Sequence, residues 1–188
     1  MDDFAPLKGD DVRRGLKVYL DSISNATIEV LSNVPLSESL LYHLNDGNTP
    51  LTPISAKAVG QSYKEGGKLS FSLRLIENAD LIGFCRFGDV GWQARHAQLH
   101  LSIVEEAYLT PEIVIDVLQT VLKLAYWEAN LNRIAVHCIE DNTLLFEALK
   151  HTGFTNEGRL RDDVYRNGRY LDRFIFSILC REWENIIG

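Results

Sequence analysis

The sequence has no apolar run long enough to cross a bilayer. Charged and polar residues interrupt every hydrophobic stretch well short of the roughly 20 residues that a spanning helix needs. The start, Met1-Asp2-Asp3, also lacks the positive charge and apolar segment of a secretory signal. We therefore expect a protein without a membrane partner, located in the cytoplasm.

Cysteine is scarce, with only three among the 188 residues, and Cys85, Cys138 and Cys180 all lie in apolar, strand-like stretches. Buried core residues in a reducing compartment explain this usage better than a disulfide or a metal site. His96 and His100 would be about 13 Å apart on a strand, too far to share one ion. We expect no metal site.

Positive charge is in the minority, with 19 Lys and Arg against 26 Asp and Glu and a net charge of −7. This balance argues against nucleic-acid binding, because affinity for a duplex depends on neutralising its phosphates. It weakly attracts cationic partners, including amines. The length suits one domain, residues 1–188, and no linker or internal repeat divides it.

The clearest local pattern lies between residues 110 and 154. Thr110-Pro111 suits the N-cap and first position of a helix, and apolar residues then recur at three- and four-residue spacing up to Asn130. Residues Arg133–Cys138 have the length and composition of a buried strand. Asn142–His151 begins with a capping residue, and Gly153 follows it as a helix-terminating glycine. The pattern predicts helix, strand and helix, packed closely together.

Strand patterns precede and follow this unit. Alternating apolar residues predict three antiparallel strands in meander order, at Lys68–Leu75, Leu81–Phe87 and Ala97–Val104. Further on, Asn167-Gly168 favours a type I′ hairpin turn before an apolar strand at Tyr170–Leu179. The alternation indicates a largely antiparallel sheet.

The N-terminal third has weaker patterns. Residues Val18–Leu31 fit either a strand or a helix, because both spacings are present. Two short helices are expected at Ser37–Leu44 and Ser55–Tyr63, with a Gly- and Pro-containing loop between them.

The predicted hairpin is rich in charge of both signs. Its arginines are Arg159, Arg161, Arg166, Arg169 and Arg173, and the interleaved acids are Glu157, Asp162, Asp163 and Asp172. We expect cross-strand ion pairs from this arrangement. An RNA-binding arm is the weaker alternative.

Several of these segments together resemble the central strands and the C-terminal half of the GNAT superfamily of acyl-CoA N-acyltransferases. They are Gly83-Phe84, Asp89–Leu99, Leu131–Ile134, Asn142–Phe154 and Glu157–Arg159. The likeness is greatest to the branch that acetylates ribosomal-protein N-termini, polyamines and antibiotics. It implies an α/β fold with a mixed, mostly antiparallel sheet flanked by helices. It also implies acetyl transfer from acetyl-CoA to a primary amine of a small molecule or peptide, by direct attack.

The resemblance implies a donor site between two strands. The strands at Ala97–Val104 and Arg133–Cys138 should run side by side and then part around the pantetheine arm, while the next helix points its N-terminus at the pyrophosphate. The residues then expected to bind acetyl-CoA are Ile103, Val104, Leu109, Thr110, Pro111, Glu112, Ile113, Val114, Asn142, Phe146 and Leu149. For Asn142, a role as helix cap is the stronger alternative.

The pyrophosphate turn departs from the family pattern. Members usually have glycines there, whereas this chain has Leu109-Thr110-Pro111-Glu112. Pro111 has no N–H to donate, and side chains crowd the backbone. A carboxylate beside a phosphate is expected to weaken binding by roughly a hundredfold. A simple helix start explains Thr-Pro-Glu equally well.

The proton-transfer residues also depart from the pattern. Leu149 stands where many members have a tyrosine that protonates the leaving thiolate, and Gln98 stands where this branch often has a glutamate. A base is needed because a protonated amine cannot attack a thioester. The candidates are His100, Glu105 and Glu106, each of which also fits a structural or solvated role.

These departures support a second hypothesis, in which a catalytically silent domain keeps the GNAT fold to bind a ligand or a protein. The sequence does not identify the acceptor. The apolar final strand also has the composition to pair across a homodimer.

Overall fold

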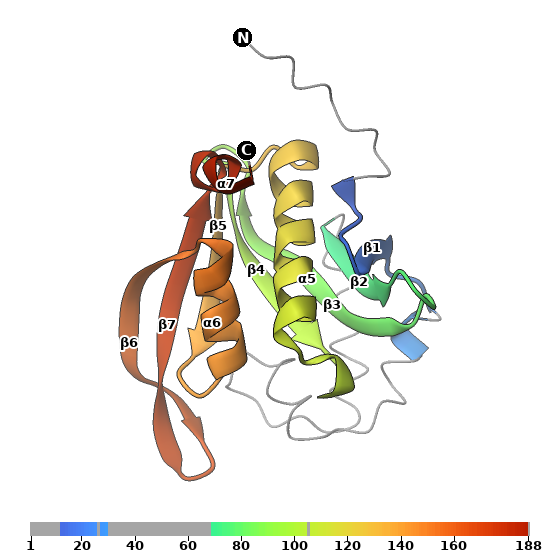
Figure 1. Cartoon of the computed structure of the whole chain (residues 1–188). Coiled ribbons are helices and arrows are strands. Elements are labelled where there is room, and N and C mark those ends of the chain that lie inside the picture. Colours follow the sequence, from blue (N-terminus) through green and yellow to red (C-terminus); the bar gives the residue numbers. More distant parts are fainter. Residues whose placement is uncertain (1–11, 26, 30–68, 105, 188) are drawn as a thin grey trace.

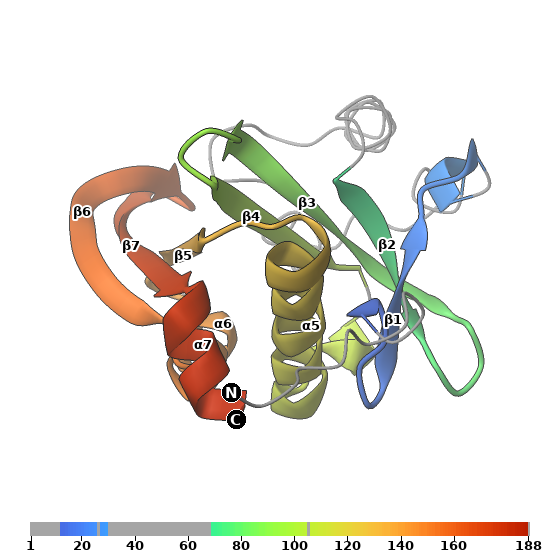
Figure 2. The same ribbon diagram turned by 90° about the horizontal axis from the view of Figure 1, so that it is seen from above.

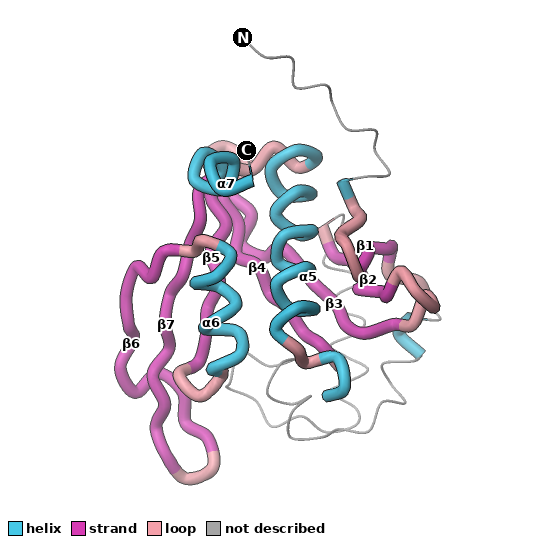
Figure 3. Tube along the Cα trace, viewed as in Figure 1, coloured by secondary structure: helices cyan, strands magenta, loops and turns pink. Residues whose placement is uncertain are grey.

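The computed structural model describes residues 12–25, 27–29, 69–104 and 106–187. Seven strands form one sheet in the order β1-β2-β3-β4-β5-β7-β6 (Figures 1 and 3). Their bounds are β1 (Val18–Ser22), β2 (Ser70–Leu75), β3 (Leu81–Gly91), β4 (His96–Ile103), β5 (Arg133–Ile139), β6 (Thr155–Arg166) and β7 (Arg169–Leu179). All neighbouring pairs are antiparallel except β4 and β5, which are parallel. The expected mixed, mostly antiparallel sheet is confirmed.

Two helices, α5 (Pro111–Lys123) and α6 (Thr143–Thr152), lie side by side against one face of the sheet (Figure 2). A short 3-10 turn, η1 (Glu106–Tyr108), precedes α5, and a π-helical turn, η2 (Leu124–Glu128), continues it. The last helix, α7 (Cys180–Ile187), was not expected from the sequence. In Figure 1 the N-terminal ends of α5 and α6 both lie at the lower end of the sheet.

The capping residues act as the sequence predicts. The Thr110 hydroxyl accepts the backbone N–H of Ile113, and Pro111 occupies the first helical position of α5. Asn142 caps α6, and Gly153 ends it with a φ of 94°, in the left-handed region where glycine is favoured. These local signals determine where both helices begin and where α6 ends.

Other boundaries differ from the expectation. Val18–Ser22 is a strand, and residues 25 and 27–29 are helical, so each alternative for this segment holds for part of it. β3 continues to Gly91, into residues expected to be a loop, because its last residues still pair with β4. The short helices expected at Ser37–Leu44 and Ser55–Tyr63 lie outside the described residues.

Asp116 connects the N-terminal segment to α5. This carboxylate is buried and accepts the backbone N–H groups of Leu16, Lys17 and Val18 at 2.8, 2.7 and 3.0 Å. The chain passes so close at Gly15 that an added Cβ would lie 2.3 Å from the hydroxyl oxygen of Thr120. Only glycine fits this approach, which positions β1 beside the helix.

The hairpin of β6 and β7 contains the expected ion pairs. Arg159 pairs with the buried Asp172, and Arg173 contacts Asp163 at 2.6 Å. The turn residues Asn167 and Gly168 both have positive φ, as a type I′ turn requires. Over Arg173–Ser177, β7 pairs with β5 on one edge and with β6 on the other. This stretch therefore has no free edge for the pairing across a dimer that its apolar composition allowed.

Two of the three cysteines, Cys85 and Cys138, are buried in the sheet as expected. Cys180 instead begins α7 and is partly exposed, so its strand-like sequence context was misleading. Within the described ranges, no helix combines the length and apolar character needed to cross a membrane.

Candidate active site

The strands β4 and β5 pair over a short distance and then separate. Their parallel ladder joins His96 to Arg133, Ala97 to Ile134 and Gln98 to Ala135, and it ends there. Beyond that point β4 stays paired with β3 up to Ile103, and β5 stays paired with β7 up to Ile139. Each strand follows its other neighbour, so the facing edges diverge and no longer satisfy each other's backbone groups.

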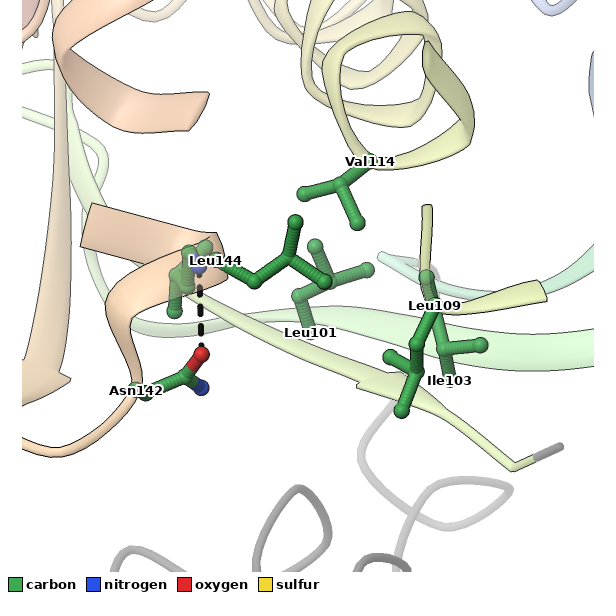
Figure 4. Close-up of a pocket in the computed structure, with 7 residues that line it drawn as sticks. Leu101, Ile103, Leu109, Val114, Asn142 and Leu144 are labelled. Atoms are coloured by element: carbon green, nitrogen blue, oxygen red, sulfur yellow. Dashed lines mark hydrogen bonds between the residues drawn. The ribbon is translucent and has the colours of Figure 1, made fainter. Parts of the chain in front are cut away.

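A pocket lies beside this gap, between β4 and the N-terminal ends of α5 and α6 (Figure 4). It is partly open to solvent and is lined by Leu101, Ile103, Leu109, Val114, Asn142, Leu144 and Leu145. Its wall is therefore apolar apart from one amide. The side-chain oxygen of Asn142 accepts the N–H of Leu145 at 3.1 Å, which holds the start of α6 at the edge of the pocket.

The tip of α5 has its backbone donors already engaged. Pro111 has no N–H, Ile113 donates to the Thr110 hydroxyl at 3.4 Å, and Val114 donates to the Thr110 carbonyl at 3.0 Å. The carboxylate of Glu112 is exposed, and its pKa is lowered first by its own backbone N–H and then by the Thr110 hydroxyl. The acidic side chain therefore lies over the first turn of the helix.

The opposite face of the sheet presents polar side chains where the strands separate. Side chains alternate along a strand, so Gln98 and His100 face away from the core residues Ala97 and Leu99. The amide nitrogen of Gln98 lies 3.2 Å from Nδ1 of His137 on β5. Had the ladder continued, His100 would stand opposite His137. Two imidazoles thus flank the beginning of the gap.

The sequence matches a known family over this region. A family profile described as an acetyltransferase (GNAT) domain matches residues 57–175, which is more than half of the chain. The chain belongs to the GNAT acetyltransferase family.

Individual relatives share only about a quarter of their aligned residues with this chain. The chain is similar to an uncharacterized N-acetyltransferase, p20, of Bacillus licheniformis, with 26% identity over 72% of this chain and 78% of that protein. It is also similar to a putative ribosomal N-acetyltransferase, YdaF, of Bacillus subtilis, with 28% identity over 58% of this chain and 60% of that protein.

Solved GNAT structures share the fold. A spermidine N-acetyltransferase from Vibrio cholerae, crystallised with CoA and spermine, superposes with a TM-score of 0.75 at 16% identity. That match covers 89% of this chain and 98% of the other. At this identity the likeness shows the fold alone.

The GNAT family uses acetyl-CoA. The residues of this pocket fit the pantetheine arm of that molecule but not its pyrophosphate. The parted strand edges and the apolar pocket suit the pantetheine arm, whose amides can bond to a strand edge while its hydrocarbon part contacts the leucines. The tip of α5 does not suit the pyrophosphate, because Thr110 and Glu112 already occupy its donors. The pocket and strand edges therefore fit the pantetheine arm, while the tip of α5 does not fit the pyrophosphate.

The predicted donor residues are only partly brought together. Ile103, Leu109, Val114 and Asn142 line the pocket, while Thr110, Pro111 and Glu112 form the tip of α5 beside it. Val104 and Ile113 are buried next to the pocket without lining it. Leu149 lies fully within the core, and Phe146 packs edge-on against Phe174 and Phe176 of β7.

The predicted bases are dispersed. Glu106 is exposed in η1, and Glu105 lies outside the described residues. His100 leans over β3, since a Cβ added at Gly88 would lie 2.9 Å from its Nε2. Of the candidates that the structure describes, only His100 is on the polar face beside the gap.

Sequence reasoning missed Leu101, Leu144 and Leu145 of the pocket wall, and also His137. Leu101 shares its strand face with Ile103, so the period-two pattern could have identified it. His137 had no local signal, because its position beside the gap depends on the register between β4 and β5.

Proposed function

We propose that this protein is an N-acetyltransferase that moves an acetyl group from acetyl-CoA to a primary amine of a small molecule or peptide, without a covalent enzyme intermediate. The observation that supports this most is the separation of β4 and β5 next to an apolar pocket at two helix N-termini. Relatives named for ribosomal and spermidine N-acetylation support an amine acceptor, as does the net charge of −7.

The residues divide into two groups under this proposal. When bound, acetyl-CoA supplies an activated thioester. Leu101, Leu144 and Leu145 bury the arm that carries it and exclude water, and Asn142 keeps the start of α6 in place. His100 on the opposite face accepts the proton of the attacking amine.

A ligand titration tests the proposal. With acetyl-CoA at about 100 times its dissociation constant, we expect the free energy of unfolding to rise by about 2.7 kcal/mol, visible as an increase in Tm. Acetyl transfer to spermidine, spermine and a free peptide N-terminus is then measured by thiol release. Binding without transfer to any of these amines would favour the catalytically silent alternative, and absence of binding would refute the donor assignment.

Replacing the two imidazoles separately distinguishes their roles. We expect His100→Gln to lower kcat by about a hundredfold, because its proton acceptor is gone. The matched variant His137→Gln, on the other side of the gap, should change kcat by less than about tenfold. Affinity for CoA, measured by calorimetry, should stay constant in both. A larger loss in His137→Gln would transfer the base role to His137.

A further inference from the structure

The backbone hydrogen-bond donors at the tip of α5 already have partners within the helix start. A helix N-terminus usually attracts anions because its first N–H groups have no partner within the helix. Here Pro111 removes one donor and the Thr110 side chain engages the N–H of Ile113. The carboxylate of Glu112 lies over the same turn. A pyrophosphate could bind there only by displacing both the cap and the carboxylate.

Charge around this tip is also unfavourable to an anion. The sequence has no Lys or Arg from Ala97 to Leu122, although it has three glutamates there. Lys17 lowers the pKa of Glu112 by less than the hydrogen bonds from the Glu112 backbone and the Thr110 hydroxyl do. On the α6 side, Arg169 already pairs with Asp141 at 3.7 Å. The segment from β4 to α5 therefore supplies no cation of its own to bind a phosphate at this tip.

The other end of the site remains suited to a ligand. The pocket is apolar, and the edges of β4 and β5 part beside it. A chain with amide groups and methyl groups, as in pantetheine, gains both strand-edge hydrogen bonds and hydrophobic burial there. Recognition is therefore concentrated on the arm of the donor.

We propose that the protein recognises its acyl donor through the pantetheine arm, with no net contribution from the pyrophosphate. Its donor class is then acyl-pantetheine thioesters in general, including those that lack the nucleotide. This inference rests on the proposed function, since it concerns the same donor site.

Calorimetric titration with CoA, 4′-phosphopantetheine and pantetheine tests the inference without requiring turnover. We expect dissociation constants within about tenfold of one another. CoA affinity should not fall between roughly 50 and 500 mM NaCl, because salt screens no attractive phosphate contact and only weakens the repulsion from Glu112. CoA binding more than about tenfold tighter than pantetheine would overturn the inference and leave the proposed function standing. Binding of none of the three would refute the proposed function as well.

A charge-removing variant gives an independent result. Glu112→Gln keeps the helix start and should strengthen CoA binding by about three- to tenfold, since the exposed carboxylate is partly screened by water. Pantetheine binding should not change. Glu147→Gln, which removes an exposed charge on α6, is the control and should alter neither affinity. An equal effect of Glu112→Gln on both ligands would contradict the placement of the carboxylate at the nucleotide end.

Discussion

Asp116→Ala is expected to lower the free energy of unfolding by about 3–4 kcal/mol, the largest stability effect that the structure predicts. The carboxylate is the shared acceptor for three backbone N–H groups, at Leu16, Lys17 and Val18. Alanine would leave these donors without a partner at a buried site, since Asp116 is only 5% exposed. Urea denaturation followed by circular dichroism measures the change.

Two further variants show whether the loss of stability comes from the missing hydrogen bonds to Asp116 or from general damage to α5. Gln119→Ala changes a partly exposed residue of the same helix and should alter stability by no more than about 0.5 kcal/mol. Asp116→Asn keeps one acceptor oxygen and should lie between the wild type and Asp116→Ala. A loss below about 1 kcal/mol in Asp116→Ala would mean that water replaces the carboxylate, and the anchor role would be wrong.

Leu144→Trp is expected to have the largest effect on ligand binding. Leu144 is partly exposed on the first turn of α6, and its side chain points into the pocket with Leu101 and Val114 (Figure 4). A tryptophan would fill the space that the donor arm needs. Losing roughly 100 Å² of buried apolar ligand surface costs about 2.5 kcal/mol, so CoA should bind close to a hundredfold more weakly by calorimetry.

The neighbouring residue provides the matched control. Thr143 precedes Leu144 in the same turn, is exposed and does not line the pocket. Thr143→Trp adds the same bulk outside the site and should leave CoA affinity unchanged. Both variants should keep the wild-type circular dichroism spectrum. Unchanged CoA binding in Leu144→Trp would place the donor elsewhere on the molecule.

The local elements were predictable because their signals act within a few residues. Thr110 and Asn142 cap the two helices, Gly153 takes the left-handed conformation, and Asn167-Gly168 forms the hairpin turn, all as expected. α7 was missed because Cys180–Ile187 continues an apolar strand without a capping residue or turn before it. Periodicity alone could not show where β7 ends.

The donor site was predictable only in part. Of the residues that the resemblance assigned to acetyl-CoA, Ile103, Leu109, Val114 and Asn142 line the pocket, and their role in donor binding stays a prediction. The resemblance also assigned Leu149 to the donor, but that side chain is enclosed in the core. The expected hundredfold penalty at Glu112 becomes smaller once the carboxylate is found exposed to solvent.

The sequence by itself determined the type and order of most described elements, since backbone preferences and hydrophobic periodicity are properties of neighbouring residues. Only the tertiary structure decided that β4 and β5 pair for three residues and then part, that Gln98 meets His137, and that Asp116 holds a segment 100 residues away. These contacts depend on which distant segments compete for the same edge or face. Such competition is settled by packing of the whole chain, and no local pattern encodes it.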